Sequence, residues 1–378
     1  MLKNVQALRA IAALLVVFDH LSYELTKSDP GGRTLLDGFR YFGQFGVDLF
    51  FVISGFIMVA TSWKMFGKAG ASVTFLLRRF VRIFPPYWLV LLPIVVAYLV
   101  APHQFLHRVE GQADIVASIL LLPTTHPRLL DISWTLTFEL FFYIVFAGIL
   151  ALRRTLLVPL LIGWFVLEIV FVVGLRDAAN PYLAFLGTPL PMEFIMGAFV
   201  GYLYRIEKMP MATTYGVLGI VLAIAVWIVS TIPGVKMVDL SKRDIVRVLQ
   251  FGLPAALIMY GAVGSELRRS SMAPRWLVAL GDGSYSIYLW HVPVSLVIAA
   301  IVARYHAHGL FESASTQVFT FAIIIAISLV SYTVFERPIT ASLNVILRSR
   351  NKSGSIASTR CALHSKLSAN RLTKSSES

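Results

Sequence analysis

Charged residues are scarce in this sequence of 378 residues: they make up 14% of it, whereas 57% of the residues are hydrophobic. A soluble globular domain carries about 25% charged residues, so this composition excludes an ordinary soluble enzyme. Cysteine is almost absent. The single Cys361 excludes an intramolecular disulfide, and no pair of soft ligands is available for a structural zinc. We therefore expect no metal site.

Internal repeats and long polar domains are also missing. The absence of a repeat disfavours a transporter built from duplicated halves. The longest polar interruption, 102–131, is expected on the outer face, and its apolar piece 113–123 is too short to span and predicts an interfacial or re-entrant segment. Residues 346–378 are Ser-rich and basic and predict a disordered cytoplasmic tail. Residues 1–345 then form one transmembrane domain.

Apolar stretches long enough to cross a bilayer recur along that domain. We predict an all-α polytopic membrane protein with about ten transmembrane helices. Their expected ranges are 5–23, 43–61, 84–101, 132–151, 155–175, 183–204, 211–231, 246–264, 281–303 and 316–337. The first begins almost at Met1 and lacks a small-residue cleavage site, so we expect it to stay in the membrane.

The distribution of Lys and Arg predicts the orientation. With the N-terminus inside, 22 of the 33 basic residues fall on the cytoplasmic side and 11 on the opposite side. This bias across short loops is typical of an N-in and C-in topology. The net charge of +13 is thus mostly a topology signal. Nucleic-acid binding is a poor explanation, because the basic residues are divided among short loops.

The first apolar segment carries ionisable residues that a plain membrane anchor lacks. Arg9 and His20 are eleven residues apart, so on a helix they share a face, about 20° out of alignment and roughly 16 Å apart along the axis. Asp19 points away from that face. Ionisable groups inside a spanning helix usually face a protein interior or a wet cavity. Alternatively, the two residues are interfacial anchors at opposite ends of the helix.

Two further segments carry charge close to apolar spans. Asp48 is interpreted as a charge partner, an acceptor for a ligand hydroxyl or an interfacial residue. Arg79 and Arg82, three residues apart, fit either a phosphate clamp or a positive-inside anchor. Pro85 and Pro86 are expected in the first turn of the next helix.

Deeper in the predicted spans lie carboxylates and a histidine. Glu139, about two turns into its helix, is expected to pair with an Arg, a His or a substrate hydroxyl. Glu168 and Glu193 are similarly deep, and any of the three is also explained as a structural hydrogen-bond hub. His291 is either a core histidine or a functional one. The predicted topology places Arg9, Arg79, Arg82 and Glu336 toward the cytoplasm and His20, Asp48 and Glu139 toward the outer half. This gradient suits a phosphorylated cytoplasmic donor and proton transfer on a hydroxyl acceptor.

Six segments, in this order, resemble the membrane acyltransferase-3 family. They are Arg9-x10-His20, GVDLFFVISGF at 46–56, Arg79-Phe80-Val81-Arg82, SWTLTFELFFY at 133–143, GDGSYSIYLWH at 281–291 and FERP at 335–338. Together they cover most of residues 4–338. The opening NVQALRAIAALLVVFDH also resembles the exopolysaccharide-production, ExoZ-like branch of that family.

The resemblance implies an enzyme that moves an acyl group from cytoplasmic acyl-CoA to a hydroxyl, commonly of a lipid-linked or growing glycan. It implies that His20 is the essential base, that Arg9 is its companion, and that Arg79 and Arg82 bind the donor. We also expect catalytic roles for Asp48 and Glu139. Trp134, Ser286 and His291 are expected to bind the acceptor. No permanently bound cofactor is expected, since acyl-CoA, with acetyl-CoA the expected form, is a co-substrate.

The sequence thus favours an inner-membrane O-acyltransferase of exopolysaccharide or its lipid-linked precursor, with polysaccharide-assembly proteins as candidate partners. Either His20 activates the hydroxyl directly, or it is acylated first and relays the group. A glycan or lipid transporter, or a non-catalytic assembly subunit, stays open as another class.

Overall fold

The computed structural model describes residues 2–28, 40–101, 112–232, 245–268, 273–304, 314–343 and 345, and every regular element in them is helical. The α-helices are α1 (Lys3–Ser28), α2 (Arg40–Ser62), α3 (Ala71–Val100), α5 (Ile115–Leu120), α6 (Trp134–Ala151), α7 (Leu157–Leu175), α8 (Pro181–Leu186), α9 (Pro191–Arg205), α10 (Ala212–Thr231), α11 (Ile245–Arg247), α12 (Leu253–Leu267), α13 (Arg275–Asp282), α14 (Ser284–Arg304) and α16 (Ala314–Ser331). Turns of 3-10 helix at Asp131–Ser133 and Arg154–Leu156 precede α6 and α7, and π-helical turns occupy Val248–Gly252 and Tyr332–Glu336.

Nine helical segments of the described ranges are long and apolar enough to cross a membrane. They are Lys3–Leu21, Gly43–Ser62, Ala71–Val100, Asp131–Ala151, Arg154–Leu175, Ala212–Ser230, Ile245–Leu267, Ser284–Ile301 and Gln317–Leu343. The predicted all-α polytopic membrane protein is confirmed, and nine of the ten expected spans are present. The expected tail, 346–378, lies outside the described residues.

The sixth expected span, 183–204, is not one continuous helix. It is divided into α8 and α9 at Gly187-Thr188-Pro189-Leu190, because prolines at 189 and 191 have no N–H to donate to a preceding turn. Although α9 has only 15 residues, it is deeply buried against α2. Gly55 and Gly197 make this possible: a Cβ at either position would overlap the backbone of the other helix.

The start of α3 also differs from the expectation. The helix begins at Ala71 instead of near residue 84, so Pro85 and Pro86 lie in its interior. The basic residues Arg79 and Arg82 are therefore on a helix, one turn apart on the same face, as a phosphate clamp requires. Pro85 and Pro86 have no N–H to donate to the Val81 and Arg82 carbonyls one turn earlier. The neighbouring Ile83 carbonyl accepts a hydrogen bond from the Tyr285 hydroxyl at 2.9 Å, which joins α14 to this part of α3.

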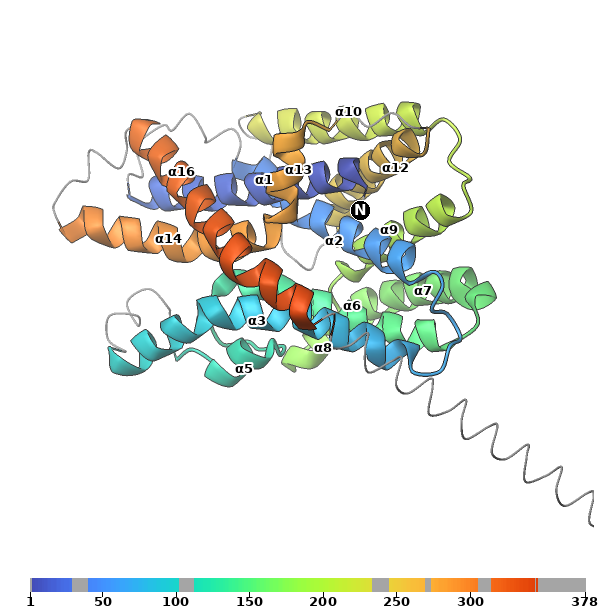
Figure 1. Ribbon diagram of the computed structural model, residues 1–378, viewed down its shortest axis with the longest axis horizontal. Coiled ribbons are helices and arrows are strands. Elements are labelled where there is room, and N and C mark those ends of the chain that lie inside the picture. Colours follow the sequence, from blue (N-terminus) through green and yellow to red (C-terminus); the bar gives the residue numbers. More distant parts are fainter. Residues whose placement is uncertain are drawn as a thin grey trace, which may run out of the picture.

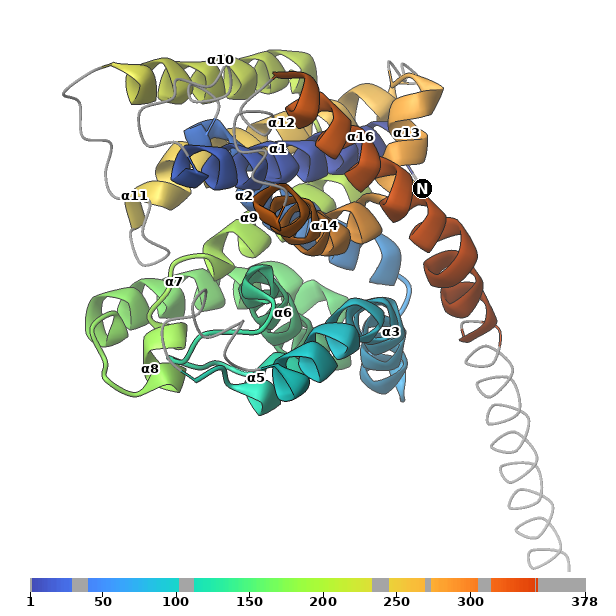
Figure 2. The same ribbon diagram turned by 90° about the vertical axis from the view of Figure 1, so that its left-hand side faces the viewer.

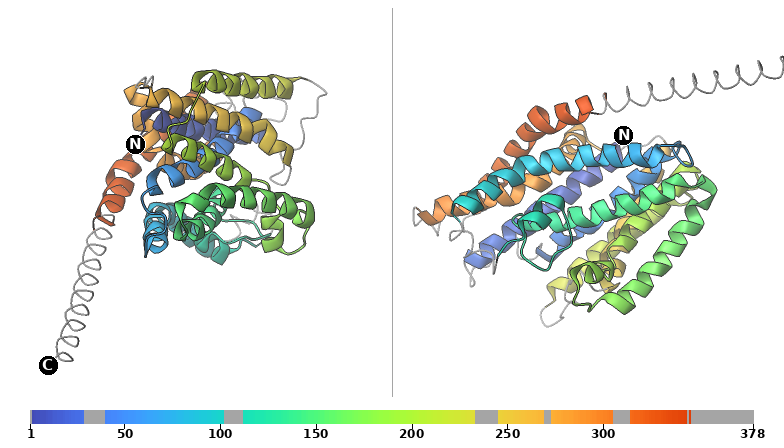
Figure 3. Two further views of the ribbon diagram at one scale, coloured as in Figure 1. Left: turned by 90° about the vertical axis from the view of Figure 1, so that its right-hand side faces the viewer. Right: turned by 90° about the horizontal axis from the view of Figure 1, so that it is seen from below.

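The helices form one elongated bundle in which α1 is central (Figure 1). Helix α10 lies along one side and α3, α6 and α7 lie along the opposite side, while α16 crosses the others obliquely (Figures 1 and 2). The start of α1 and the last turns of α16 are at the same end of the bundle (Figure 3). An N-in and C-in topology requires this arrangement and an even number of crossings, so the short α9 must cross as well as the nine long segments. We call this end of the bundle the amino-terminal end; the charge distribution predicts that it is cytoplasmic.

Candidate active site

A cavity lies inside the bundle where α1, α2, α3, α6 and α14 meet. It contains about 720 Å³ of free space, including its open mouth. Its polar lining consists of Arg9, Ser54, Arg79, Arg82, Thr135, Glu139, Tyr143, Tyr285 and Tyr288, and the remainder is apolar. We call it the donor cavity, after the expectation from the sequence that Arg79 and Arg82 bind the donor. Four residues that the sequence singled out, from three different helices, therefore meet in one place: Arg9, Arg79, Arg82 and Glu139.

Arg9 is held in position by residues that the sequence did not indicate. Its side chain is only 6% exposed, and one guanidinium nitrogen donates to the Gln6 amide oxygen at 3.0 Å. The Gln6 amide nitrogen in turn donates to the Asp282 carboxylate. Asp282 is in the GDGSYSIYLWH segment and is the last residue of α13. This chain of contacts therefore fixes Arg9 of α1 against the end of α13. A buried arginine held this way presents its remaining N–H groups to the cavity.

Arg79 and Glu139 are joined through Tyr143. The Arg79 guanidinium lies 5.4 Å from the centre of the Phe75 ring and 5.5 Å from that of Tyr143, within the range of cation–π attraction. Glu139 accepts hydrogen bonds from Ser54, at 3.0 Å, and from the Tyr143 hydroxyl. The donor cavity thus holds three guanidinium groups and one carboxylate, an excess of positive charge that suits an anionic ligand.

The position of Glu139 differs from the expectation. The sequence placed it in the outer half together with His20 and Asp48, but it lies in the donor cavity beside the arginines. The depth of Glu139 in α6 is as expected, and the reason for the difference is the side of the helix that it faces: it bonds to Ser54 of α2 and to Tyr143 one turn further along α6. Glu139 bonds to the hydroxyls of Ser54 and Tyr143, close to the arginines of the cavity, and not to a histidine.

His20 is outside the donor cavity and faces His291. The centres of the two rings are 4.8 Å apart and the rings meet edge to face. In each histidine the Nδ1 atom lies beside a backbone carbonyl one turn earlier: Val16 for His20, at 3.0 Å, and Tyr288 for His291, at 2.6 Å. A carbonyl oxygen can only accept, so Nδ1 carries the proton and Nε2 of each neutral ring keeps its lone pair. Both rings thus have the tautomer that a base acting through Nε2 needs.

The Nε2 atom of His291 is buried and has no hydrogen-bond partner among the described residues, and its side chain is only 1% exposed. A buried polar atom without a partner in the protein is uncommon, so Nε2 of His291 is free to accept a hydrogen bond from a bound molecule. The sequence could not pair His291 with His20, because 271 positions separate them along the chain. Asp19 lies on another side of α1, against Gly43 of α2, as its helical phase predicted.

One aromatic layer separates the histidine pair from the donor cavity. Phe50 and Tyr288 both line the cavity and meet edge to face with their ring centres 6.0 Å apart. The Tyr288 ring is 5.6 Å from that of His291. Its hydroxyl donates to the Ile132 carbonyl at 2.8 Å and lies 2.6 Å from the Thr135 hydroxyl. The order from the amino-terminal end is therefore arginines, aromatic layer, histidines.

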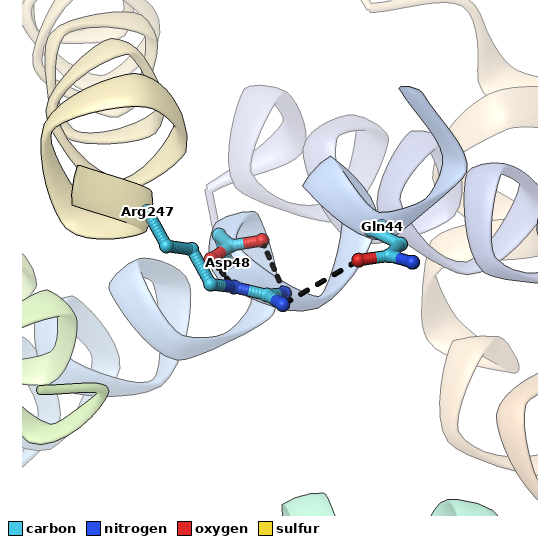
Figure 4. Close-up of polar contacts among 3 residues, drawn as sticks. All are labelled: Gln44, Asp48 and Arg247. Carbon is cyan, nitrogen blue, oxygen red and sulfur yellow. Dashed lines mark hydrogen bonds and ion pairs between the residues drawn. The ribbon is translucent and has the colours of Figure 1, made fainter. Parts of the chain in front are cut away.

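Asp48 is not part of this arrangement. It is completely buried and bound by Arg247, whose Nε and NH2 groups donate to its two carboxylate oxygens at 2.8 and 2.9 Å (Figure 4). A third N–H of Arg247 reaches the Gln44 amide oxygen at 3.5 Å. Of the alternatives for Asp48, the structure supports a charge partner. The sequence does contain a sign of this ion pair, because Arg247 is a cation in the first turn of the expected span 246–264 and needs an anionic partner there.

Ser286 and Trp134, expected to bind the acceptor, lie outside the donor cavity. The Ser286 hydroxyl donates to Glu336 at 2.6 Å, joining α14 to the end of the last span. Glu168, another deep carboxylate, accepts the Trp164 indole N–H at 2.6 Å with Oε1, and its buried Oε2 has no hydrogen-bond partner among the described residues. No cluster of three potential metal ligands occurs in the part of the chain that the structure describes.

Trp134 instead lines a second hollow, which is open at the end of the bundle opposite the amino-terminal end. This outer depression contains about 1240 Å³ of free space, including its mouth. The loop before α6, the first turns of α6 and helix α8 form its walls. Arg128 lies on the loop. Burial lowers the pKa of its guanidinium below the ordinary value, although Tyr87 and Asp131 act in the opposite direction.

Comparison with known proteins identifies the chain. The family profile described as an acyltransferase domain matches residues 2–335. The chain belongs to the acyltransferase-3 family. The match covers the donor cavity, the histidine pair and every membrane-spanning segment except the end of the last one, after residue 335. The protein is therefore a multi-pass membrane acyltransferase.

Three relatives in this family have informative names. Exopolysaccharide production protein ExoZ of Rhizobium meliloti is 29% identical over 308 residues, which are 79% of this chain and 89% of that protein. Nodulation protein 10 of Rhizobium leguminosarum bv. viciae is 26% identical over 326 residues, 79% of this chain and 84% of that protein. Peptidoglycan O-acetyltransferase OatA of Listeria monocytogenes is 25% identical, over 77% of this chain and 49% of that longer protein. No solved structure matches the chain.

Proposed function

We propose that this acyltransferase moves an acyl group, expected to be acetyl, from acyl-CoA to a hydroxyl of an exopolysaccharide or its lipid-linked precursor in the bacterial inner membrane. The observation that carries the proposal is the succession of arginine cavity, aromatic layer and histidine pair. The names of two relatives, an exopolysaccharide production protein and a peptidoglycan O-acetyltransferase, support a glycan acceptor.

The donor cavity has the positive charge that binds a thioester on a long phosphorylated carrier. Arg9, Arg79 and Arg82 bind the phosphates, because guanidinium groups make paired hydrogen bonds to phosphate oxygens. These arginines lie toward the predicted cytoplasmic end, where acyl-CoA is available. The acyl group lies at the aromatic rings of Phe50 and Tyr288, which also line the cavity. Transfer requires these two rings to separate, so that the thioester carbonyl reaches the histidine pair.

At the histidine pair, Nε2 of His20 takes the proton from the acceptor hydroxyl while the hydroxyl oxygen bonds to the thioester carbonyl carbon. The carbon–sulfur bond then breaks, and the thiolate takes the proton from His20 and leaves as CoA thiol. The ester product keeps the acyl group. His291 is a positioning residue in this scheme: its buried Nε2 accepts a hydrogen bond from the acceptor and its ring supports that of His20.

The test is acyl transfer by purified protein from labelled acetyl-CoA to the cell's own polysaccharide, with the product read by mass spectrometry. His20→Ala is expected to lower the transfer rate by about 10²–10⁴-fold, the usual contribution of a general base. His364→Ala, which replaces a histidine of the expected tail, is the matched control. Full activity of His20→Ala at normal expression would exclude this mechanism.

Two alternatives give different results in the same assay. If His20 becomes acylated first, acid quenching without acceptor traps a labelled acyl-imidazole on the wild-type protein and none on His20→Ala. If the protein is a transporter or a non-catalytic subunit, glycan binding persists but neither acyl-CoA hydrolysis nor transfer is observed.

A further inference from the structure

The outer depression has the composition of a sugar site. Three aromatic residues, Trp134, Phe138 and Phe185, contribute to its walls, and the Phe138 and Phe185 rings stack with their centres 4.2 Å apart. Arg128 and Asp131 line it as well. An aromatic surface packs against the C–H face of a pyranose, while a carboxylate and a guanidinium bond to its hydroxyls. One cation balanced by one anion suits a neutral polyol better than a phosphate or a lipid tail.

A specific polar atom supports a ligand at this place. The Arg128 side chain is fixed by a hydrogen bond from NH2 to the Leu122 carbonyl at 2.7 Å. Its NH1 group is buried and has no hydrogen-bond partner among the described residues. A buried guanidinium nitrogen without a partner is costly, so a ligand or water is expected to accept from it.

The loop that carries Arg128 is held rigidly. Asp114 caps α5 by accepting from the Ala117 backbone N–H at 2.8 Å, and it also accepts from the Thr124 hydroxyl at 3.1 Å. The backbone N–H of Asp114 bonds to the Pro127 carbonyl at 3.1 Å. A preformed loop binds a ligand without the entropic cost of ordering it. These contacts explain why a six-residue helix forms in the short apolar piece 113–123.

The depression and the donor cavity lie on two sides of the same helical turns. Thr135 and Glu139 of α6 line the donor cavity, whereas Trp134 and Phe138 line the depression. Phe51, which lines the donor cavity, has its ring centre 6.4 Å from that of Trp134. His20 and His291 do not line the depression, so a sugar bound there is not the one that is acylated.

We propose that the outer depression is a sugar subsite that holds a residue of the acceptor glycan neighbouring the one presented to His20. The proposal rests on the proposed function and adds the acceptor's binding mode. An acceptor of several sugars occupies the outer depression and the histidine pair at once, and the second contact raises its affinity. A single sugar occupies only one of these two sites.

The test compares a long acceptor oligosaccharide with the corresponding monosaccharide, using Trp134→Ala and Asp131→Ala in the full-length protein in detergent. The ratio of kcat/KM for the long over the short acceptor is expected to fall by about 10-fold in each variant. A general folding defect would lower both values and leave the ratio unchanged. Tyr182→Ala and Asp177→Ala are matched controls at the same end of the bundle, since neither residue lines the depression, and both are expected to keep the wild-type ratio.

Calorimetric binding of the oligosaccharide gives a second readout that needs no transfer. Weaker binding by Asp131→Ala than by Asp177→Ala supports the subsite even if no acyl transfer occurs, in which case the proposed function alone fails. The subsite is overturned if both variants keep the wild-type ratio or the wild-type binding constant. A depression that retains phospholipid and excludes the oligosaccharide would also overturn it.

Discussion

The Asp48–Arg247 ion pair stabilises the fold, and acyl transfer is expected to proceed without it. The two side chains are 0% and 3% exposed, and two charge-assisted hydrogen bonds of 2.8 and 2.9 Å join them. Arg247→Met removes the cation and leaves a buried carboxylate unpaired. Breaking one partner of such a pair costs about 3–5 kcal/mol. This corresponds to a factor of roughly 10²–10⁴ in the folding equilibrium.

Removing both charges is expected to restore stability. In Asp48→Leu combined with Arg247→Met, apolar side chains of similar length replace the pair, and such replacements are often neutral or stabilising by about 1–4 kcal/mol. Glu193, also fully buried, interacts electrostatically with Arg247. Glu193→Gln in the doubly substituted protein therefore controls for the remaining carboxylate. Unfolding in detergent gives the stability, and labelled acyl transfer at equal protein gives the activity.

Two results would refute the reasoning. A doubly substituted protein that is as unstable as Arg247→Met would show that the pair is not the source of the loss. One that unfolds like the wild type but transfers no acyl group would place Asp48 in the chemistry, as the sequence first suggested.

Three further outcomes follow from the same geometry. Arg79→Gln is expected to raise KM for acyl-CoA by about 10-fold or more, with a smaller effect in Arg79→Lys, because one charged hydrogen-bond donor to phosphate is lost; steady-state kinetics measures this. Gly197→Ala is expected to destabilise the protein by about 1–3 kcal/mol, because its Cβ meets the α2 backbone, whereas Gly148→Ala, which has open space, is expected to be neutral or stabilising; melting temperatures in detergent compare them. Phe50→Ala is expected to allow longer acyl chains, which a competition between acetyl- and hexanoyl-CoA would detect. A wild-type preference for acetyl-CoA in that variant would contradict the role of Phe50.

Much of the fold follows from hydrophobic length alone. Nine of the expected spans are present because an apolar helix of about 20 residues has no other stable environment. The break at 187–190 was missed because hydropathy counts Gly, Pro and Leu as apolar and does not register their missing hydrogen bonds. The extended α3 was missed for a related reason: Arg79 and Arg82 looked like the end of a loop, although a cavity inside the protein accommodates them.

The candidate site was only partly predictable. The sequence selected Arg9 and Glu139 because charges inside spans are costly and hence informative. It selected Arg79 and Arg82 because two arginines three residues apart fit a phosphate clamp. It could not say which charges meet. In the sequence, Asp48 and Glu139 are both carboxylates within expected spans and cannot be told apart. In the structure, Asp48 is bound by Arg247 and Glu139 lines the donor cavity. That distinction depends on helix rotation and on contacts between segments about 200 residues apart, which periodicity does not encode.

The separation between Arg9 and His20 now constrains the donor. Their axial offset is about 16 Å, and the Phe50–Tyr288 layer lies between the arginines and the histidines. A small acyl phosphate held by the arginines would leave its carbonyl far from either imidazole. A thioester at the end of a long flexible arm would reach past the aromatic layer while its phosphates stayed at the arginines. The spacing of two residues on one helix therefore supports the proposal that the donor is acyl-CoA and not a compact acyl donor.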